Sequence, residues 1–172
     1  MKSVLVFASG EGTNFEAIVE YFKGKEVKIE LLCNVDGAGV IKRAKRLNVN
    51  FYIVRFAQTF EFLKSKKYDL YVLAGYMRIL PQGILDFGKF VNIHPSLLPE
   101  FKGVDAIKRA FLSGKKETGV SVHYVNEEVD SGEIIAQQKC LIEPDMTLCD
   151  LEHKIHDIEH KLYPKVIEGL LR

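Results

Sequence analysis

An asparagine and a histidine two residues apart, Asn92 and His94, are the strongest candidates for chemistry in this sequence of 172 residues. They end an apolar stretch that is typical of a β-strand, and this spacing places both side chains on the same side of the strand. An amide N–H beside an imidazole can stabilise a tetrahedral oxyanion and transfer a proton. The alternative is a histidine whose hydrogen bonds are all local.

A carboxylate and a second histidine follow later in the chain. Asp130 lies in the polar segment 126–132, and a carboxylate near His94 would favour the protonated imidazole and could orient a water molecule. An aspartate before Ser-Gly is also typical of a solvated turn. His123, on the apolar run that leads into this segment, is equally consistent with a structural and an active-site role.

Two glycines, Gly10 and Gly12, interrupt the chain directly after its first apolar run. Because glycine has no Cβ, the backbone there can approach a ligand closely, and the N–H groups at the start of the next helix can bind an anion. Phe15 replaces the third glycine of a dinucleotide-binding turn, and no GxxxxGK[ST] motif is present. A phosphate monoester is therefore the predicted ligand. The alternative is a tight turn without a ligand.

His156, Glu159 and His160 form an HxxEH pattern on a predicted helix, as in inverted zinc peptidases. The third ligand of a catalytic zinc ion usually lies well downstream, and the sequence offers none before Arg172. We therefore expect no metal. The same side chains could instead form the polar or site-facing edge of an amphipathic helix.

The elements that must position these residues alternate between strands and helices. We predict strands at 4–8, 29–35, 51–54, 70–74 and 90–93, and helices at 15–22, 40–47, 60–66, 84–87 and 105–112, the first with Thr13 or Asn14 as N-cap. Such alternation gives a parallel sheet that helices cover on both faces through right-handed crossovers.

The pattern changes after residue 114. Two strands, 119–125 and 133–142, are separated by a polar loop, and a last helix runs over 147–171 with Thr147 as N-cap. The predicted fold class is α/β, with an open, mostly parallel, doubly wound (Rossmann-like) sheet and an antiparallel excursion near the C-terminus. No linker or repeat interrupts it, so we expect one domain over 1–172.

Three unusual segments, 10–14, 76–80 and 92–95, all follow predicted parallel strands. Ligands of open α/β sheets bind at the carboxyl ends of the strands. We therefore expect these segments to meet at one pocket.

Composition narrows the function classes. The chain is 47% hydrophobic and 27% charged, with a net charge of +1, so it has no basic surface suited to nucleic acid or an anionic membrane. Its apolar runs are too short to span a bilayer, and the N-terminus shows no secretory pattern. The three cysteines form no CxxC pair, which suits a reducing compartment. We expect a cytoplasmic protein.

With these residues the sequence resembles the folate-dependent formyltransferases along nearly its whole length. The segments that carry the resemblance are Ser9-Gly-Glu-Gly-Thr-Asn14, Leu73-Ala-Gly-Tyr-Met-Arg-Ile-Leu80, Asn92-Ile-His-Pro-Ser-Leu-Leu-Pro99, Phe101-Lys-Gly103, Gly119-Val-Ser-Val-His123, Glu128-Val-Asp-Ser-Gly132 and Glu159-His-Lys-Leu-Tyr-Pro164. The third motif is highly specific to folate-dependent formyltransferases and hydrolases, and the first indicates the glycinamide ribonucleotide branch.

The resemblance implies the formyltransferase fold and a role for each site residue. A catalytic trio would consist of Asn92, His94 and Asp130. The ribonucleotide would be bound by Gly12, Thr13, Asn14, His156 and Glu159. The folate would be bound by Met77, Arg78, Ile79, Leu80 and Asn92 and by the loop residues Asn126, Glu127, Glu128, Val129 and Asp130.

The implied reaction transfers a formyl group from 10-formyltetrahydrofolate, a co-substrate, to the amine of glycinamide ribonucleotide, as in purine synthesis. No metal takes part, and the partners are small molecules rather than nucleic acid or a membrane. The protein would be a monomer or homodimer. Alternatives are another folate-dependent formyltransferase, a formyltetrahydrofolate hydrolase, and a binding module without turnover.

Overall fold

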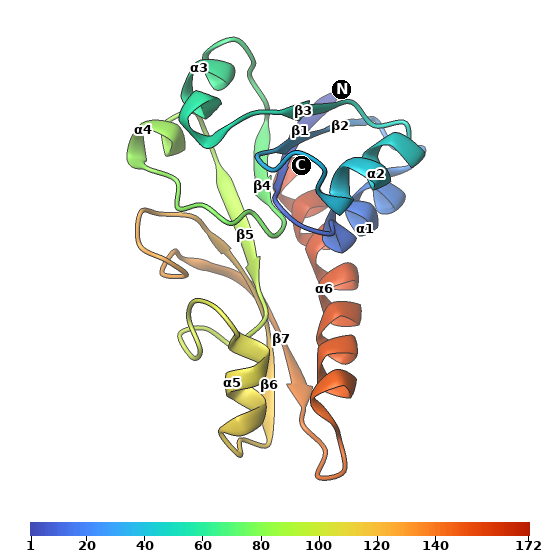
Figure 1. Ribbon diagram of the computed structural model, residues 1–172, viewed down its shortest axis with the longest axis vertical. Coiled ribbons are helices and arrows are strands. Elements are labelled where there is room, and N and C mark those ends of the chain that lie inside the picture. The colour runs from blue at the N-terminus through green and yellow to red at the C-terminus, as the bar shows by residue number, and fades with distance from the viewer.

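The computed structural model describes residues 1–172 and contains one seven-stranded sheet between two layers of helices (Figure 1). The strands lie in the order β3-β2-β1-β4-β5-β6-β7. Their bounds are β1 (Lys2–Ala8), β2 (Val27–Cys33), β3 (Phe51–Ile53), β4 (Leu70–Leu73), β5 (Phe90–His94), β6 (Glu117–Tyr124) and β7 (Ile134–Leu141). The pairs among β1 to β5 are parallel, whereas β6 pairs antiparallel with both β5 and β7. The predicted fold class is confirmed.

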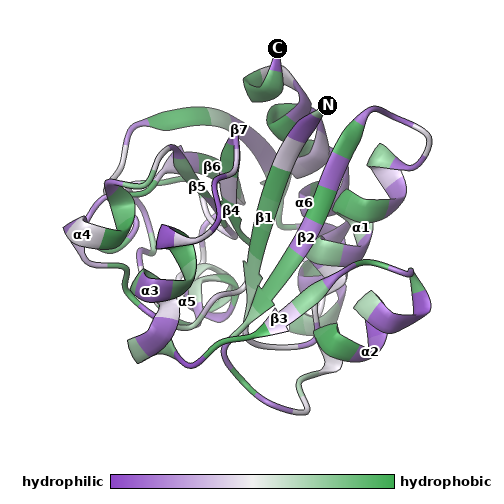
Figure 2. Cartoon of the chain, turned by 90° about the horizontal axis from the view of Figure 1, so that it is seen from above, coloured by the Kyte–Doolittle hydropathy of each residue, from purple (hydrophilic) through white to green (hydrophobic).

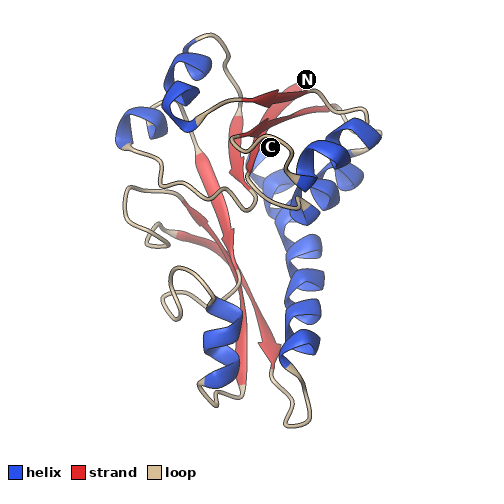
Figure 3. Cartoon of the chain, in the orientation of Figure 1, coloured by secondary structure: helices blue, strands red, loops and turns tan.

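The helices connect the strands and cover the sheet on both sides (Figure 3). Their bounds are α1 (Thr13–Phe22), α2 (Gly39–Arg46), α3 (Thr59–Lys64), α4 (Gln82–Leu85), α5 (Ala106–Leu112) and α6 (Leu148–Leu171), with a 3₁₀ turn, η1, at Phe56–Gln58. The 3₁₀ turn was absent from the sequence prediction. The ends of the other elements differ from the predicted ones by a few residues.

Two apolar clusters lie on opposite faces of the sheet, because alternate side chains of a strand point in opposite directions. In β1, Val4 and Val6 join the larger cluster, which α1, α2 and α6 cover, whereas Leu5 and Phe7 join the smaller one under α3 and α4. Each fully buried side chain of this size stabilises the fold by roughly 1.5–3 kcal/mol. Figure 2 shows β1 and β2 as largely hydrophobic strands beside helices with hydrophilic segments.

The strand order reverses between β1 and β4, which creates the switch point where such sheets bind ligands. The two segments that leave these strands are bonded to each other. Ser9 N donates to Gly75 O at 3.0 Å, and Met77 N donates to Ser9 Oγ at 2.9 Å. The glycine turn and the 76–80 segment therefore meet at one edge of the sheet. The single pocket predicted for all three segments is only partly confirmed, because residues 76–80 and 92–95 line one cavity whereas residues 10–14 do not line it.

Helix α6 fixes the C-terminal part of the chain against this edge. Thr147 is its N-cap, as predicted, and forms a capping box with Asp150. The hydroxyl of the fully buried Tyr163 lies 2.8 Å from Leu73 O, at the carboxyl end of β4, and 3.1 Å from Val91 O in the first half of β5, so α6 is bonded to both strands. The helix passes through Pro164 and ends at Leu171.

The predicted cap of α1 is wrong. Gly12, in the left-handed region with φ 77°, stands at the N-cap, and no side chain caps the helix. Thr13 and Asn14 are the first helical residues. A side chain at residue 12 would collide with Val40, which explains why glycine, rather than a capping residue, occupies this position.

Candidate active site

The His94 side chain and the Asp130 carboxylate form a buried pair at the end of β5. His94 Nδ1 lies 3.3 Å from Asp130 Oδ2, and both side chains are 8% exposed. Asp130 reaches this position from the loop between β6 and β7, where its backbone has φ 51°. The two residues are thus brought together from segments 36 positions apart (94 and 130), as their chemistry requires.

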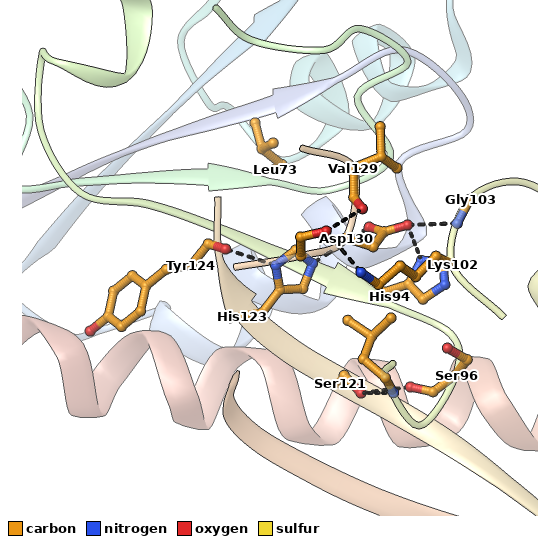
Figure 4. A network of polar contacts seen from close by, with 12 residues as sticks. Leu73, His94, Ser96, Lys102, Gly103, Ser121, His123, Tyr124, Val129 and Asp130 are labelled. Atoms are coloured by element: carbon orange, nitrogen blue, oxygen red, sulfur yellow. Dashed lines mark hydrogen bonds and ion pairs between the residues drawn. The ribbon is translucent and has the colours of Figure 1, made fainter. Parts of the chain in front are cut away.

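A second imidazole contacts the same carboxylate (Figure 4). His123 Nε2 lies 3.6 Å from Asp130 Oδ1, and His123 Nδ1 lies 2.8 Å from the carbonyl oxygen of Tyr124. Burial favours the neutral acid, but the imidazole of His123, the N–H of Gly103 and the charge of His94 outweigh it and lower the pKa of Asp130. Asp130 is therefore an ionised base or ion-pair partner.

Two backbone groups of one loop complete the pair. His94 Nε2 donates to Phe101 O at 2.8 Å, and Gly103 N donates to Asp130 Oδ2 at 2.8 Å. Because the Phe101 carbonyl can only accept, this contact places a proton on Nε2. The ring thus presents one nitrogen to the loop and the other to the carboxylate.

Polar side chains from β6 and β7 hold the first part of that loop. Ser121 Oγ accepts from Leu98 N at 3.0 Å and donates to Ser96 O at 2.6 Å. Gln137 Nε2 donates to Ser121 Oγ at 2.8 Å and to Leu98 O at 3.0 Å. These supporting residues have no local sequence signal, because nothing in the sequence marks two polar residues on different strands as partners.

A cavity of about 460 Å³ opens beside the pair. Asn92, His94, His123 and Asp130 all line it, so the predicted catalytic residues share one space. Of the predicted folate residues, the lining includes Met77, Arg78, Ile79, Leu80, Asn126, Glu128 and Val129. Large apolar side chains are exposed here, with Met77 72% and Ile79 62% exposed.

Glu127 is the one predicted folate residue outside the cavity lining. Its carboxylate accepts a hydrogen bond from the backbone N–H of Gln82 at 3.1 Å. The contact attaches the 126–130 loop to the start of α4. Glu127 therefore supports the loop in this structure, and its side chain does not contribute to the lining.

Three of the predicted ribonucleotide residues, Asn14, His156 and Glu159, meet between α1 and α6. Asn14 Nδ2 donates to Glu159 Oε2 at 3.3 Å, and His156 Nδ1 lies 2.9 Å from the same oxygen. Glu159 is only 4% exposed. Asn14 Oδ1 and His160 Nε2 are buried without a hydrogen-bond partner in the protein, which is unusual for buried polar atoms and fits a site that receives a polar ligand.

The two histidines of this cluster have opposite electrostatic settings. The hydrogen bond to Glu159 raises the pKa of His156, whereas burial lowers the pKa of His160. Each histidine is thus biased towards a different protonation state. Glu159 contacts Asn14 and His156. Nowhere in the structure are three or more His, Cys, Asp or Glu side chains arranged to hold a metal ion.

The glycine turn lies against α2. Gly10 O accepts from Val40 N at 3.0 Å, and Arg43 Nε donates to Glu11 O at 2.7 Å. Thr13 is exposed, and Gly12 precedes the first free N–H groups of α1.

None of the helices is long and apolar enough to cross a membrane.

Comparison with known proteins gives a consistent result. A profile of the formyl transferase family matches residues 2–167. The chain is 42% identical over 186 residues to a phosphoribosylglycinamide formyltransferase from Bacillus subtilis, covering 99% of this chain and 95% of that protein.

Solved structures agree over the full length. Glycinamide ribonucleotide transformylase 1 from Geobacillus kaustophilus is 44% identical and superposes with a TM-score of 0.92, covering 100% of both chains. Phosphoribosylglycinamide formyltransferase from Streptococcus pneumoniae is 36% identical with a TM-score of 0.91, again covering 100% of both chains.

Proposed function

Because the chain belongs to the formyl transferase family, with phosphoribosylglycinamide formyltransferases as its relatives, we propose that it moves a formyl group from 10-formyltetrahydrofolate to the amine of glycinamide ribonucleotide. The product is formylglycinamide ribonucleotide, an intermediate of purine synthesis. The observation that carries the proposal is that Asn92, His94 and Asp130 line one cavity. Both substrates are small molecules.

The cavity suits a folate. A flat pterin ring needs apolar side chains around it and a few polar groups that fix its orientation. Met77, Ile79, Val104 and Val129 are exposed around this cavity, and such a group of exposed apolar side chains is typical of a binding site. Arg78 and Leu80 complete the same wall, and Asn126 and Glu128 supply polar groups from the loop between β6 and β7.

The second cluster suits the acceptor. The N–H groups that follow Gly12 can bind the phosphate, because the first turn of a helix leaves its donors free and carries a partial positive charge. The buried carboxylate of Glu159 can receive the glycinamide end, with Asn14 beside it. The unpartnered oxygen of Asn14 supports this assignment, since a donor on the ligand would satisfy it.

The chemistry follows from the pair at the end of β5. The amine attacks the formyl carbon, and a tetrahedral intermediate with a negatively charged oxygen forms. The Asn92 amide and the His94 imidazole donate to that oxygen, so the ring exchanges one of its present contacts for the substrate. The Asp130 carboxylate orients the imidazole and helps transfer the proton from the amine to the folate nitrogen as the bond between that nitrogen and the formyl carbon breaks.

The decisive experiment measures absorbance of the folate product with and without glycinamide ribonucleotide. We expect product only when the acceptor is present. Product that forms equally without the acceptor would mean hydrolysis and would refute the proposed transfer.

Because the three cysteines are free, a reducing compartment such as the cytoplasm suits the protein.

Variants test the catalytic assignment in the same assay. His94→Ala and Asp130→Asn should each lower kcat on the order of a hundred- to a thousandfold, the range for loss of an oxyanion-stabilising group. Glu133→Gln is the matched control, because this exposed carboxylate lies three residues from Asp130 (133 and 130) and outside the cavity lining. A folded His94→Ala or Asp130→Asn variant with near-normal transfer would remove that residue from the mechanism.

A further inference from the structure

Arg109, on the exposed side of α5, contacts the loop that holds the catalytic pair. Its Nη2 donates to Phe101 O at 3.1 Å and also contacts Lys102 O, and its Nε donates to Val104 O at 3.0 Å. Three of the five guanidinium N–H donors are therefore used on three carbonyls of residues 101–104. Its Cζ also lies 5.9 Å from the centre of the Phe101 ring.

This loop has a conformation that the chain does not adopt readily by itself. Phe101, Gly103 and Asp105 have φ angles of 51°, 81° and 55°. The left-handed region costs a non-glycine residue roughly 1–2 kcal/mol, so contacts from outside the loop must offset the cost at Phe101 and Asp105. Arg109 supplies such contacts, and it does so from a short helix that begins directly after the loop.

The same loop determines how the catalytic pair is placed. Phe101 O accepts from His94 Nε2, and Gly103 N donates to Asp130 Oδ2. The Phe101 carbonyl oxygen has two lone pairs and therefore accepts from His94 and Arg109 at once. Displacement of this carbonyl would rotate the imidazole, and displacement of Gly103 would release the carboxylate.

We propose that Arg109 is a positioning residue for the formyl transfer, which rests on the function proposed above. It never touches the substrates. It fixes the backbone of 101–104, and that backbone holds the ring of His94 and the carboxylate of Asp130 in place before the substrates bind. Loss of Arg109 lowers kcat and leaves the KM for glycinamide ribonucleotide nearly unchanged. The KM for the folate rises as well, because Gly103 and Val104 of the same loop line the folate cavity.

The test compares Arg109→Met with Lys108→Met, which removes a neighbouring exposed cation from the same helix. We expect Arg109→Met to lose between about tenfold and a hundredfold in kcat, the range for catalytic groups displaced by an ångström or less. Lys108→Met should stay within twofold of the wild type. Ethylguanidinium should restore part of the lost rate in Arg109→Met, whereas ethylammonium at equal concentration should not.

A spectroscopic measurement keeps this inference separate from the proposed function. In the ¹⁵N–¹H spectrum of the imidazoles, the His94 signals should shift or broaden in Arg109→Met while those of His156 stay in place. This result needs no substrate, so it holds even if the wild type transfers no formyl group. Should Arg109→Met be unstable, Arg109→Lys gives the same readouts, with an intermediate loss because one ammonium replaces the fork that spans three carbonyls.

Three outcomes would overturn the proposal. The first is an Arg109→Met kcat within twofold of the wild type, and the second is an equal loss in Lys108→Met. The third is a set of His94 ring signals that does not change in either Arg109 variant.

Discussion

Replacing Gly12 by alanine should destabilise the whole protein, not only the turn in which this glycine lies. The added Cβ would lie 2.4 Å from Cγ2 and 2.6 Å from Cβ of Val40, and 2.9 Å from its Cα. Val40 is fully buried at the start of α2, and its N–H donates to Gly10 O. Neither the β-branched side chain nor the backbone can move aside without displacing α2.

The size of the effect follows from two costs. Alanine at φ 77° occupies the left-handed region, which costs roughly 1–2 kcal/mol, and the added atom overpacks the contact with Val40, which typically costs about 1–3 kcal/mol. Together they predict a loss of about 2–5 kcal/mol in the free energy of unfolding. That is a large part of the roughly 5–15 kcal/mol that stabilises a typical domain.

Urea unfolding followed by far-UV circular dichroism measures this loss, since the chain has no tryptophan for fluorescence. Gly10→Ala is the matched control, because its Cβ would have no neighbour within 4 Å. Adding Val40→Ala to Gly12→Ala should show a coupling of about 0.5–3 kcal/mol, as for other residues in contact. Equal unfolding free energies for Gly12→Ala and Gly10→Ala would refute the argument that α2 closes this turn to side chains.

Three further predictions concern α6 and the loop between β6 and β7. The hydrogen bond to Glu159 raises the pKa of His156, so this ion pair stabilises the fold fully below the unfolded pKa of about 6.5 and loses that effect as pH rises through the folded pKa. The unfolding free energies of His156→Gln and the wild type should therefore converge in alkaline buffer. A difference that stays constant with pH would contradict this. Tyr163→Phe leaves two buried carbonyls without this donor and should cost about 1–3 kcal/mol in urea unfolding, and an unchanged midpoint would exclude the anchoring role. Gly132→Ala places a Cβ 1.6 Å from Tyr124 O and should lower both kcat and stability, whereas normal values would show that the strand ending can adapt.

Most of the fold follows from patterns that are local in sequence. Strand β1 is apolar at every position from Val4 to Ala8 because both of its faces are buried, and such runs are recognisable without a partner. β2 begins at Val27, two residues before the predicted start. The sequence hides this start, because the charged residues Lys28 and Glu30 interrupt the apolar pattern in the first half of the strand. Glu30 is buried yet bonded to Tyr68 at 2.7 Å, and no local pattern reveals such a partner.

The candidate site was predictable to the extent that chemistry marks its residues. Asn92, His94 and Asp130 were recognisable from residue type, spacing and motif, and they line one cavity. The supports were not: a backbone carbonyl such as that of Phe101 has no sequence signature. Arg109 looks like any exposed arginine on a short helix until its three carbonyl partners are seen.

The 126–132 loop has two parts, a base that is bonded to the sheet and an exposed tip. Tyr124 N donates to Glu133 O at 2.9 Å, and Gly132 packs directly against Tyr124 O. Asp130 belongs to this bonded base, whereas Asn126 to Val129 are exposed. If the loop binds folate as proposed, substitutions at the tip would alter which folate derivatives bind, for example those with bulkier rings, while the carboxylate of Asp130 would keep its place. On the proposed function, donor preference and catalytic rate would then change independently within a single short loop.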